Sequence, residues 1–437
     1  MDSFEINKSL LDFIAQCPTC YQVTDEFAKE LEAHNFIRLY ENEHWTLTPN
    51  RNYFVTRNDS SLIAFKIPKQ EITGIQLAAA HSDSPLLKIK PNPELACESA
   101  YVKLNIEKYG GLLCAPWMDR PLSIAGRVVL RTSDGVESKL VDLRTPVALV
   151  PSLAIHMDSK GNAGREYKVQ TDLAPLISLD PNFSLNELIA KNIGVDTSDI
   201  IASDLFCYNT ERNLIWGPEN EFISSRSLDD LQCAWSCMTA FIQAEPLDDR
   251  MSVCAVFDNE EVGSATKQGA DSSFLHDVLL RIEGALQSSS KEDMQSWLAN
   301  SMMISADNAH SVHPNHPEVA CPSNRPHLNE GIVIKHSANQ RYTTDALSAA
   351  AFKLICERAN VPTQDFTNHS DRMGGSTLGN ISTTHVSINS VDVGLAQLAM
   401  HSPFETAGTK DTAYMVQAMK AFFESEFTPK KDGSYRI

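Results

Sequence analysis

The chain has 437 residues, of which 42% are hydrophobic and 21% are charged, and its formal net charge is -19. This length suits one large or two ordinary domains, and the composition is that of a soluble globular protein. The negative charge argues against nucleic acid and anionic membranes as partners, because their phosphates would be repelled.

The sequence carries no sign of a membrane segment or a secretory signal. No apolar run approaches the roughly 20 residues that span a bilayer, and residues 1–5 form neither a basic nor an apolar stretch. The ten cysteines are scattered, which is typical of reduced thiols. Cys17 and Cys20 form a Cys-x-x-Cys without the second pair that a structural zinc site needs, so we interpret them as a helix-ending turn. We therefore expect a cytoplasmic protein.

The first ninety residues begin with helical patterns and continue with strands. Apolar residues at helical spacing predict helices over residues 3–16 and 24–34. Alternation predicts strands within residues 45–66, on either side of a polar turn at 57–60. Residues 74–80 are largely apolar and predict a buried strand that ends at His81.

From about residue 89 to residue 221 the pattern changes to short β-like segments with frequent turn residues. Alternating strands and helices then return. The later elements are predicted, in order, as a helix over 229–244, a strand over 251–257, a helix over 274–287, strands over 301–306 and 331–335, a helix over 346–359, a strand over 385–388 and a helix over 411–424.

This order predicts an α/β/α sandwich around a mostly parallel or mixed sheet, interrupted by an inserted mostly-β domain. We expect residues 1–90 and 223–437 to form the main domain and residues 91–222 the insertion. In such sheets, ligands bind outside the carboxyl ends of the strands. His81, the pair Glu260-Glu261 and Asp307 each follow a predicted strand directly. We therefore expect these side chains at one edge of the sheet.

The adjacent carboxylates of Glu260 and Glu261 are costly at the end of a buried strand. They repel each other, and a half-buried anion costs several kcal/mol unless it is paired. A multivalent cation would remove that cost, and one glutamate could then bind metal while its neighbour moved protons. The alternative is an acidic, solvated turn.

Other segments offer further ligands. His81 could bind metal through one nitrogen and donate its other N–H to Asp83, which lies on the same side of an extended chain. Asp229 or Asp230 could cap the predicted helix or bridge two cations. Asp307, His310, His313 and His316 are further candidates, among which spacing does not select. His401 is a lone histidine near the end of an apolar run, and without other signs of metal a core or capping role would be favoured for it.

The order of these motifs resembles the aspartyl aminopeptidase family of dinuclear zinc exopeptidases over nearly the whole chain. The matching motifs are His81-x-Asp83, Leu153-Ala154-Ile155-His156, Leu228-Asp229-Asp230, Asp258-Asn259-Glu260-Glu261-Val262-Gly263-Ser264, Ser305-Ala306-Asp307, Ala309-His310, Val312-His313-Pro314-Asn315, Val333-Ile334-Lys335, Gln340-Arg341-Tyr342 and Ala399-Met400-His401-Ser402. One such motif would be weak, but several in the right order are specific.

The resemblance implies two zinc ions per subunit, although other divalent metals could serve. The residues implied for one zinc are His81, Asp229 and Asp307, and those for the other are Asp229, Glu261 and His401. Nitrogen and oxygen ligands without a thiolate suit an open, catalytic site. On the same resemblance, Asp83 orients His81, and Glu260 is the general base that takes a proton from a zinc-activated water.

The implied activity is the removal of N-terminal residues, preferentially Asp or Glu, from peptides with a free N-terminus. An acidic substrate needs a local cation in so acidic a chain, and Lys335 with Tyr342 nearby is the candidate. His313 is a further substrate-binding candidate. His156 matches a histidine that reaches the active site of a neighbouring subunit. The family forms tetrahedral dodecamers with dimer contacts through the insertion, which implies the same homo-oligomer here.

The chain departs from the family pattern at positions that are not expected ligands. Ser227 stands where relatives commonly carry arginine, with Arg226 preceding it, and Asn308 stands where many carry methionine. Cys17 and Cys20 occupy a turn that often holds serine. These departures bear on the acidic preference more than on hydrolysis.

Two other functions compete with this interpretation. One is a carboxypeptidase or amidohydrolase on the same dinuclear zinc scaffold. The other is a non-catalytic peptide-binding or shell protein. A non-catalytic protein would not need Glu260, so its presence favours an enzyme.

Overall fold

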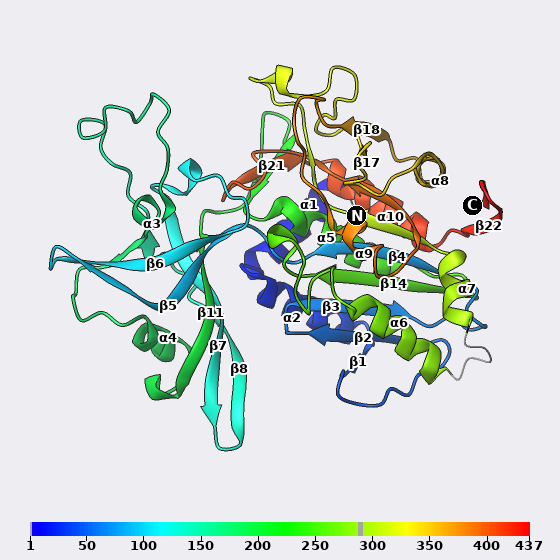
Figure 1. The fold of residues 1–437 in the computed structure, drawn as a ribbon, viewed down its shortest axis with the longest axis horizontal. Coiled ribbons are helices and arrows are strands. Elements are labelled where there is room, and N and C mark those ends of the chain that lie inside the picture. The colour runs from blue at the N-terminus through cyan, green and yellow to red at the C-terminus, as the bar shows by residue number, and fades with distance from the viewer. Residues whose placement is uncertain (1, 287–291) are drawn as a thin grey trace.

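The computed structural model describes residues 2–286 and 292–437. Figure 1 shows a sandwich of helices and strands with a β-rich region beside it. The middle layer of the sandwich is a nine-stranded sheet. Its strands, in spatial order, are β1 (Ile37–Leu39), β2 (Asn52–Arg57), β3 (Ser61–Lys66), β14 (Arg250–Phe257), β4 (Gly74–His81), β15 (Met302–Ala306), β19 (Asn389–Gly394), β17 (Ile332–His336) and β18 (Thr363–Thr367).

The sheet is mixed, as predicted. The central neighbours β14, β4, β15 and β19 run parallel to one another. In contrast, β3 pairs antiparallel with β14, and β17 pairs antiparallel with β19. Because the central strands are parallel, their carboxyl ends meet at the same edge of the sheet.

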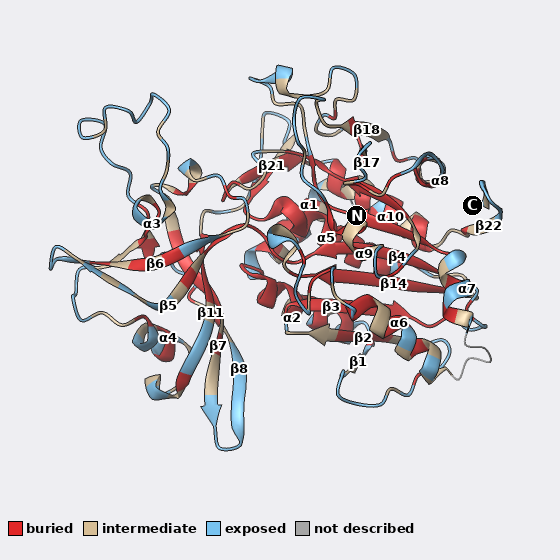
Figure 2. Ribbon diagram, in the orientation of Figure 1, coloured by how far each residue is buried: buried red, intermediate tan, exposed pale blue. Residues whose placement is uncertain are grey.

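Helices cover both faces of this sheet, which explains why its strands are apolar on both sides. Successive residues of β4 show the alternation, since Leu77 and Ala78 enter two different hydrophobic clusters. Figure 2 shows the helices turning their buried sides toward the sheet. The helices that contribute to the cluster of Ala78 are α1 (Ser3–Gln16), α2 (Cys20–Ala33), α5 (Leu228–Gln243), α8 (Ala346–Arg358) and α10 (Asp411–Phe423). Those that contribute to the cluster of Leu77 are α6 (Phe274–Ala285), α7 (Asp293–Ala299) and α9 (Leu378–Ser382).

Most elements lie where the sequence predicts them, with differences at their ends. Helix α2 begins at Cys20 rather than at residue 24, directly after the extended residue Thr19. Cys17, which directly follows α1, and Cys20, the first residue of α2, are buried, free thiols. The strand predicted over residues 385–388 is wrong, because this segment turns after α9 and pairs with β15 only from Asn389 onward. Gln287, the last residue of one predicted helix, lies outside the described residues.

The β-rich region has its own sheet and its own core. Its seven strands are, in spatial order, β11 (Ile200–Asn209), β5 (Leu86–Cys97), β6 (Tyr101–Tyr109), β10 (Leu176–Ser178), β9 (Ala148–Leu149), β7 (Pro121–Thr132) and β8 (Gly135–Asp142). An additional pairing between β11 and β7 closes a barrel, which removes free sheet edges there. Its core contains the fully buried Trp117, Leu122 and Cys207.

Shorter elements complete the described chain. A five-stranded sheet joins β12 (Leu214–Trp216), β13 (Phe222–Ser225), β21 (Glu405–Gly408), β20 (Ala396–Leu398) and β16 (Ala309–His310). A hairpin of β22 (Thr428–Lys431) and β23 (Ser434–Arg436) ends the chain. The remaining helices are α3 (Val169–Asp172), α4 (Leu185–Ile193) and the 3₁₀ turns η1 (Ala115–Trp117), η2 (Thr197–Asp199), η3 (Glu260–Val262) and η4 (Pro317–Val319).

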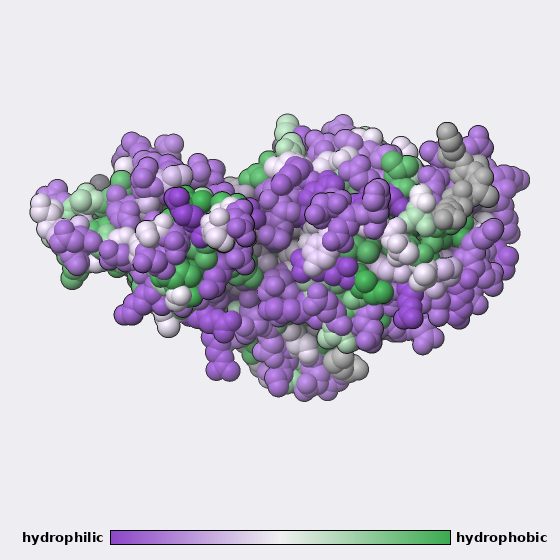
Figure 3. Space-filling view, turned by 90° about the horizontal axis from the view of Figure 1, so that it is seen from below, coloured by the Kyte–Doolittle hydropathy of each residue, from purple (hydrophilic) through white to green (hydrophobic). Residues whose placement is uncertain are grey.

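The separate β-rich core agrees with the predicted mostly-β insertion, whereas the division at residues 90/91 and 222/223 stays a prediction. Within residues 2–286 and 292–437, no helix is both long and apolar enough to cross a membrane. Figure 3 shows a face that is mostly hydrophilic, with apolar residues in small groups.

Candidate metal centre

Acidic residues and histidines gather at the carboxyl edge of the central strands. His81 is the last residue of β4 and pairs in register with Phe257, the last residue of β14. Glu260 and Glu261 follow β14 in the η3 turn, and Asp307 directly follows β15. The parallel register therefore brings these side chains to one edge, as the sequence predicts. Asp229 from the start of α5 and His401 from the segment after β20 join them.

These side chains form two groups that could each hold a metal ion. The first consists of His81, Asp229, Asp230 and Asp307, and the second of Asp229, Glu261 and His401. In each group, one ligand atom per residue lies within 4.8 Å of all the others. Every residue that the family resemblance implies as a ligand is in one group or the other, and Asp230 is an addition.

Asp229 belongs to both groups because its two oxygens approach different histidines. Its Oδ1 lies 3.5 Å from Nε2 of His81, and its Oδ2 lies 3.3 Å from Nε2 of His401. The same nitrogen of His401 lies 3.3 Å from Oε2 of Glu261. One carboxylate thus faces both groups, which is the arrangement a bridging ligand needs.

Several buried carboxylate oxygens at this edge have no hydrogen-bond donor among the described residues. They are Oδ1 of Asp229, Oδ1 of Asp230 and Oε1 of Glu261. A buried acceptor without a partner is costly, and each such atom calls for an explanation. Metal ligation supplies one, and a donor set of nitrogen and oxygen without sulfur suits zinc in an open site.

Burial and mutual repulsion leave these carboxyl groups poorly ionised without a cation. Burial raises the pKa of Glu260 to about 8, and the nearby Asp307 adds to the rise. Burial also raises the pKa values of Asp230 and Glu261 well above their usual range. Asp229 is the exception: burial opposes ionisation, but its contacts with His401 and His81 hold its pKa below the usual range. A cation bound at this edge would therefore stabilise the ionised form of these carboxyl groups.

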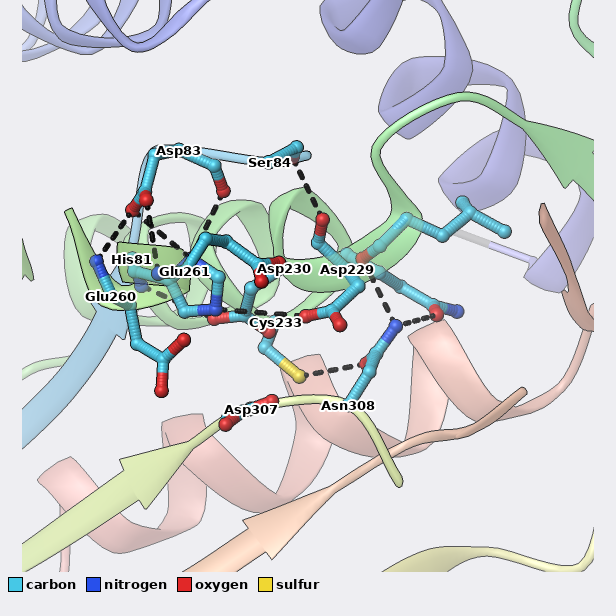
Figure 4. A network of polar contacts seen from close by, with 12 residues as sticks. His81, Asp83, Ser84, Asp229, Asp230, Cys233, Glu260, Glu261, Asp307 and Asn308 are labelled. Atoms are coloured by element: carbon cyan, nitrogen blue, oxygen red, sulfur yellow. Dashed lines mark hydrogen bonds and ion pairs between the residues drawn. The ribbon is translucent and has the colours of Figure 1, made fainter. Parts of the chain in front are cut away.

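Asp83 contacts both His81, as the sequence suggests, and the Glu260-Glu261 turn, which the sequence did not suggest. Its main-chain oxygen lies 3.0 Å from Nδ1 of His81, and its carboxylate oxygen Oδ1 lies 3.4 Å from the same nitrogen. The carboxylate also accepts the backbone N–H groups of Glu260 and Glu261, each at 3.1 Å. Figure 4 shows Asp83 above both segments, with dashed contacts to each. One buried aspartate thus holds two strand ends together.

Two further supporting residues were missed from the sequence. The buried Glu405 in β21 accepts the backbone N–H of Asp229 at 3.0 Å and that of His401 at 2.7 Å. Tyr109 in β6 donates its hydroxyl to Asp83 at 2.7 Å. Neither lies in a pattern that local spacing reveals. The tyrosine is notable because it reaches the site from the β-rich region.

Asn308, a departure from the family pattern, has a structural role beside the site. Its side chain donates to the main-chain oxygen of Leu228 at 2.9 Å, and it accepts from the thiol of Cys233 at 3.0 Å. The residue after Asp307 is thus tied to the first turn of α5, where Asp229 lies. Figure 4 includes this link between the two ligand-bearing segments.

Four further candidates are Lys335, Tyr342, His313 and His156. Lys335 in β17 is buried, with Nζ 3.5 Å from Oδ1 of Asp307 and 5.6 Å from the centre of the Tyr342 ring. His313 lines a cavity of about 350 Å³, and Met400 is also among its lining residues. His156 is exposed in a turn of the β-rich region, and the structure records no hydrogen bond or ion pair for it with any described residue.

Comparison with known proteins gives matches over most of the chain. A family model described as Aminopeptidase I zinc metalloprotease (M18) matches residues 13–423. A Clostridium novyi protein described as probable M18 family aminopeptidase 2 is 44% identical over 423 residues, which are 95% of this chain and 97% of that protein. The cryo-EM structure of an Ape4 and Nbr1 complex contains a chain with a TM-score of 0.93 and 34% identity, covering 96% of this chain and 86% of that one. The S. cerevisiae mApe1 dodecamer has a TM-score of 0.83 and 28% identity, covering 95% of each chain.

Proposed function

Because the chain belongs to the M18 family of zinc aminopeptidases, we propose that it uses two zinc ions to remove N-terminal Asp or Glu from peptides. Membership of this family shows that the protein is a zinc-dependent aminopeptidase. It does not favour the alternative functions of a carboxypeptidase, an amidohydrolase or a non-catalytic shell protein. The count of two ions, the roles of individual residues and the acidic preference are the parts proposed here.

The observation that carries the two-zinc proposal is the position of Asp229 between two groups of ligand atoms. His81, Asp229 and Asp307 would hold one ion, and Asp229, Glu261 and His401 would hold the other. The unpaired oxygens of Asp229 and Glu261 fit this assignment. When bound, zinc polarises a carbonyl group and lowers the pKa of water toward neutrality.

Glu260 is the residue we assign to proton transfer. It belongs to neither group of ligand atoms, although its neighbour Glu261 belongs to one. The carboxylate of Asp83 accepts the backbone N–H of Glu260. This hydrogen bond fixes the main chain of Glu260 beside the ligand groups. The Glu260 carboxylate would accept a proton from the attacking water and deliver it to the leaving amine.

A panel of aminoacyl anilides tests the reaction. We expect hydrolysis of substrates with a free amine, no hydrolysis of N-blocked ones, and loss of activity with a chelator. Glu260→Gln should keep its zinc, measured by elemental analysis, and lose about 10²- to 10⁴-fold in kcat. Chelator-insensitive hydrolysis would refute the metal mechanism, and full activity in Glu260→Gln would refute the assigned base.

The acidic preference rests on the buried ammonium group of Lys335. Its Nζ lies 3.5 Å from Oδ1 of the expected ligand Asp307, and the ring of Tyr342 lies beside it. The competing cation is Arg372, which lines the cavity beside His313. His313 is proposed to contact the substrate from that cavity. A charged hydrogen bond contributes about 1.5–3 kcal/mol, which is enough to sort acidic from neutral substrates.

The two cations are separated by comparing Lys335→Met with Arg372→Gln. We expect Lys335→Met to lower kcat/KM for a glutamyl anilide about 10- to 100-fold more than for a leucyl anilide, with zinc content unchanged. Arg372→Gln should leave the ratio of the two substrates within about threefold. Equal losses on both substrates in Lys335→Met would contradict the assignment.

Self-association is supported by the related mApe1 dodecamer. We propose that this chain forms a tetrahedral dodecamer and that His156 reaches a neighbouring active site. The exposed Leu153, Ile155 and Met157 around His156 support a contact there, because an apolar cluster of this kind is suited to burial. Native mass spectrometry should give twelve chains per particle, and a monomer would contradict the proposal. A cytoplasmic location stays a prediction.

A further inference from the structure

An open cavity of about 630 Å³ lies away from the metal centre, between helix α1 and the β-rich region. Its lining comes from three parts of the chain that are distant in sequence: α1, the end of β8 with the residues after it, and the connection from β11 to β12. Arg226, the residue before the turn into α5, also lines it. The M18 chemistry described above uses none of these side chains.

Arg226 is a buried cation without a carboxylate partner. It is 6% exposed, and the structure records no ion pair for it with any described residue. Its Nη2 donates to the main-chain oxygens of Ile14 at 2.6 Å and Ala15 at 3.3 Å, and its guanidinium lies 5.0 Å from the centre of the Tyr208 ring. These contacts cap the end of α1, which is a structural role.

The cap uses only part of the guanidinium. Nε has no hydrogen-bond acceptor among the described residues, and no bond is recorded for Nη1. Burial lowers the pKa of Arg226, yet arginine remains charged in proteins. A buried charge that lacks a counter-ion is costly. Arg226 therefore borders the cavity as a buried charge whose hydrogen-bonding capacity is only partly used.

Further cations surround the cavity. Lys8 and Arg212 are exposed, and neither forms an ion pair with a described residue, although the chain has 56 acidic residues. Arg144 reaches Gln16 at 3.2 Å and lies 3.6 Å from Asp142.

The carboxylates that face the same space are Asp12, Asp142 and Glu211. Asp142 accepts the hydroxyl of Tyr208 at 2.7 Å, and Glu211 is paired with Arg120. Only Asp12 is left without a recorded partner, and it is exposed at the end of α1. The cationic side chains thus exceed the free carboxylates in this cavity, against the sign of the whole chain.

We propose that this cavity binds a small multivalent oxyanion, such as phosphate, a phosphate ester or a di- or tricarboxylate. Arg226 would offer its free N–H groups at the base, where the planar guanidinium suits two-point contact with an oxyanion. Lys8 and Arg212 would close over it from two different segments. The ligand would join α1 to the β11–β12 connection.

The test is calorimetric titration of the zinc-loaded enzyme with inorganic phosphate at constant ionic strength, with citrate as a second probe. Because phosphate can also ligate zinc, the metal centre is first saturated with an amino-acid hydroxamate. We expect one site per chain. Tighter binding of phosphate assigns the site to phosphate compounds, and tighter binding of citrate assigns it to carboxylates.

Anion binding by variants of the lining residues tests whether the anion binds in this cavity. Lys8→Gln combined with Arg212→Gln, both at exposed positions, should weaken binding roughly five- to tenfold. Arg226→Gln should abolish binding, with folding checked by circular dichroism because it also loses the α1 cap. Arg131→Gln, an exposed arginine outside the cavity, should bind like the original chain. Failure of both probes to bind at 10 mM, or equal affinity in the original chain and the double variant, would overturn the proposal.

Discussion

The sandwich and the β-rich region differ in where polar side chains lie along their strands. Strand β14 is buried along its whole length, whereas β8 is exposed at most of its positions. A strand covered on both faces has little room for charge except at its ends, so the acids and histidines of the metal centre lie at one edge of the sheet. The β-rich region instead carries its polar groups along open strands and loops. It reaches the metal centre through Tyr109 and through the main-chain oxygen of Gly111, which contacts His401.

The difference shows how the site is held. At the sandwich edge, carboxylates hold backbone groups: Asp83 holds the Glu260-Glu261 turn, and Glu405 holds Asp229 and His401. The β-rich region adds the hydroxyl of Tyr109, which donates to Asp83, and the main-chain oxygen of Gly111, which lies 3.1 Å from Nδ1 of His401. We therefore expect substitutions at the edge to abolish activity and substitutions in the β-rich region to act on stability or to tune the rate.

The largest effect is expected from Asp229→Asn, because Asp229 is the residue common to both ligand groups. Loss of one carboxylate charge should remove zinc from both groups. The fall in kcat/KM should therefore exceed the roughly 10²- to 10⁴-fold that a general base supplies. Zinc content by elemental analysis and anilide hydrolysis measure the two effects. Asp134→Asn, in the exposed hairpin between β7 and β8, is the control and should keep both. Zinc retained at full stoichiometry in Asp229→Asn would contradict the assignment of Asp229 as a ligand common to both groups.

The independence of the two cores is tested by Trp117→Ala and Phe274→Ala. Each residue is fully buried, one in the β-rich core and the other in the sandwich. Each substitution should cost about 3–5 kcal/mol through lost contacts and a cavity. Hydrogen exchange read by mass spectrometry should show lost protection in β7 and β11 for Trp117→Ala, and in β14 for Phe274→Ala. Equal loss of protection in all three strands, in both variants, would mean that the two regions unfold as one unit.

The opposite edge of the sandwich contains a buried cation that makes stability depend on pH. Nζ of Lys66 donates to the main-chain oxygens of Ala244 at 2.7 Å and Ile242 at 3.2 Å, and burial lowers its pKa to about 8. Between that pKa and the unfolded value of roughly 10.4, the unfolded chain binds more protons than the folded one. Stability should therefore rise with pH across this window, by about 3 kcal/mol at most.

Denaturant unfolding at pH 7.5, 9 and 10.5 measures this dependence. Lys66→Met should flatten the rise, because it removes the titrating group. Lys69→Met, at an exposed lysine three residues further on, should leave the slope as it is in the original chain. A slope that is the same in all three proteins would show that Lys66 does not titrate in this window.

The smallest of these effects is expected from Tyr109→Phe, which breaks the contact from the β-rich region to Asp83. Removal of a residue that orients a metal-site group typically costs about 10- to 100-fold in activity or metal affinity. Tyr101→Phe, on the same strand but exposed, is the matched control. If Tyr109→Phe is as active as Tyr101→Phe, the β-rich region contributes nothing to the rate through this contact.

Much of the site could be predicted because it follows the ends of strands. The largely apolar run to His81, the one to Phe257 and the one to Ala306 each identify a strand, and parallel pairing then brings their carboxyl ends together. Asp229 and His401 could not be selected in this way, since one begins a helix and the other is a lone histidine. For these two, the resemblance to a family supplied the assignment.

The sequence by itself determined the α/β class, the mostly-β interruption and the edge at which the carboxylates gather, because these follow from local periodicity and chain order. Only the tertiary structure decided that Glu405 and Tyr109 support the site, that Lys335 lies against Asp307, and that Arg226 borders a cavity without a counter-ion. The physical reason is range: the spacing of residues along a chain fixes which side of an element they face. Contacts between residues far apart in sequence depend on how the two regions pack.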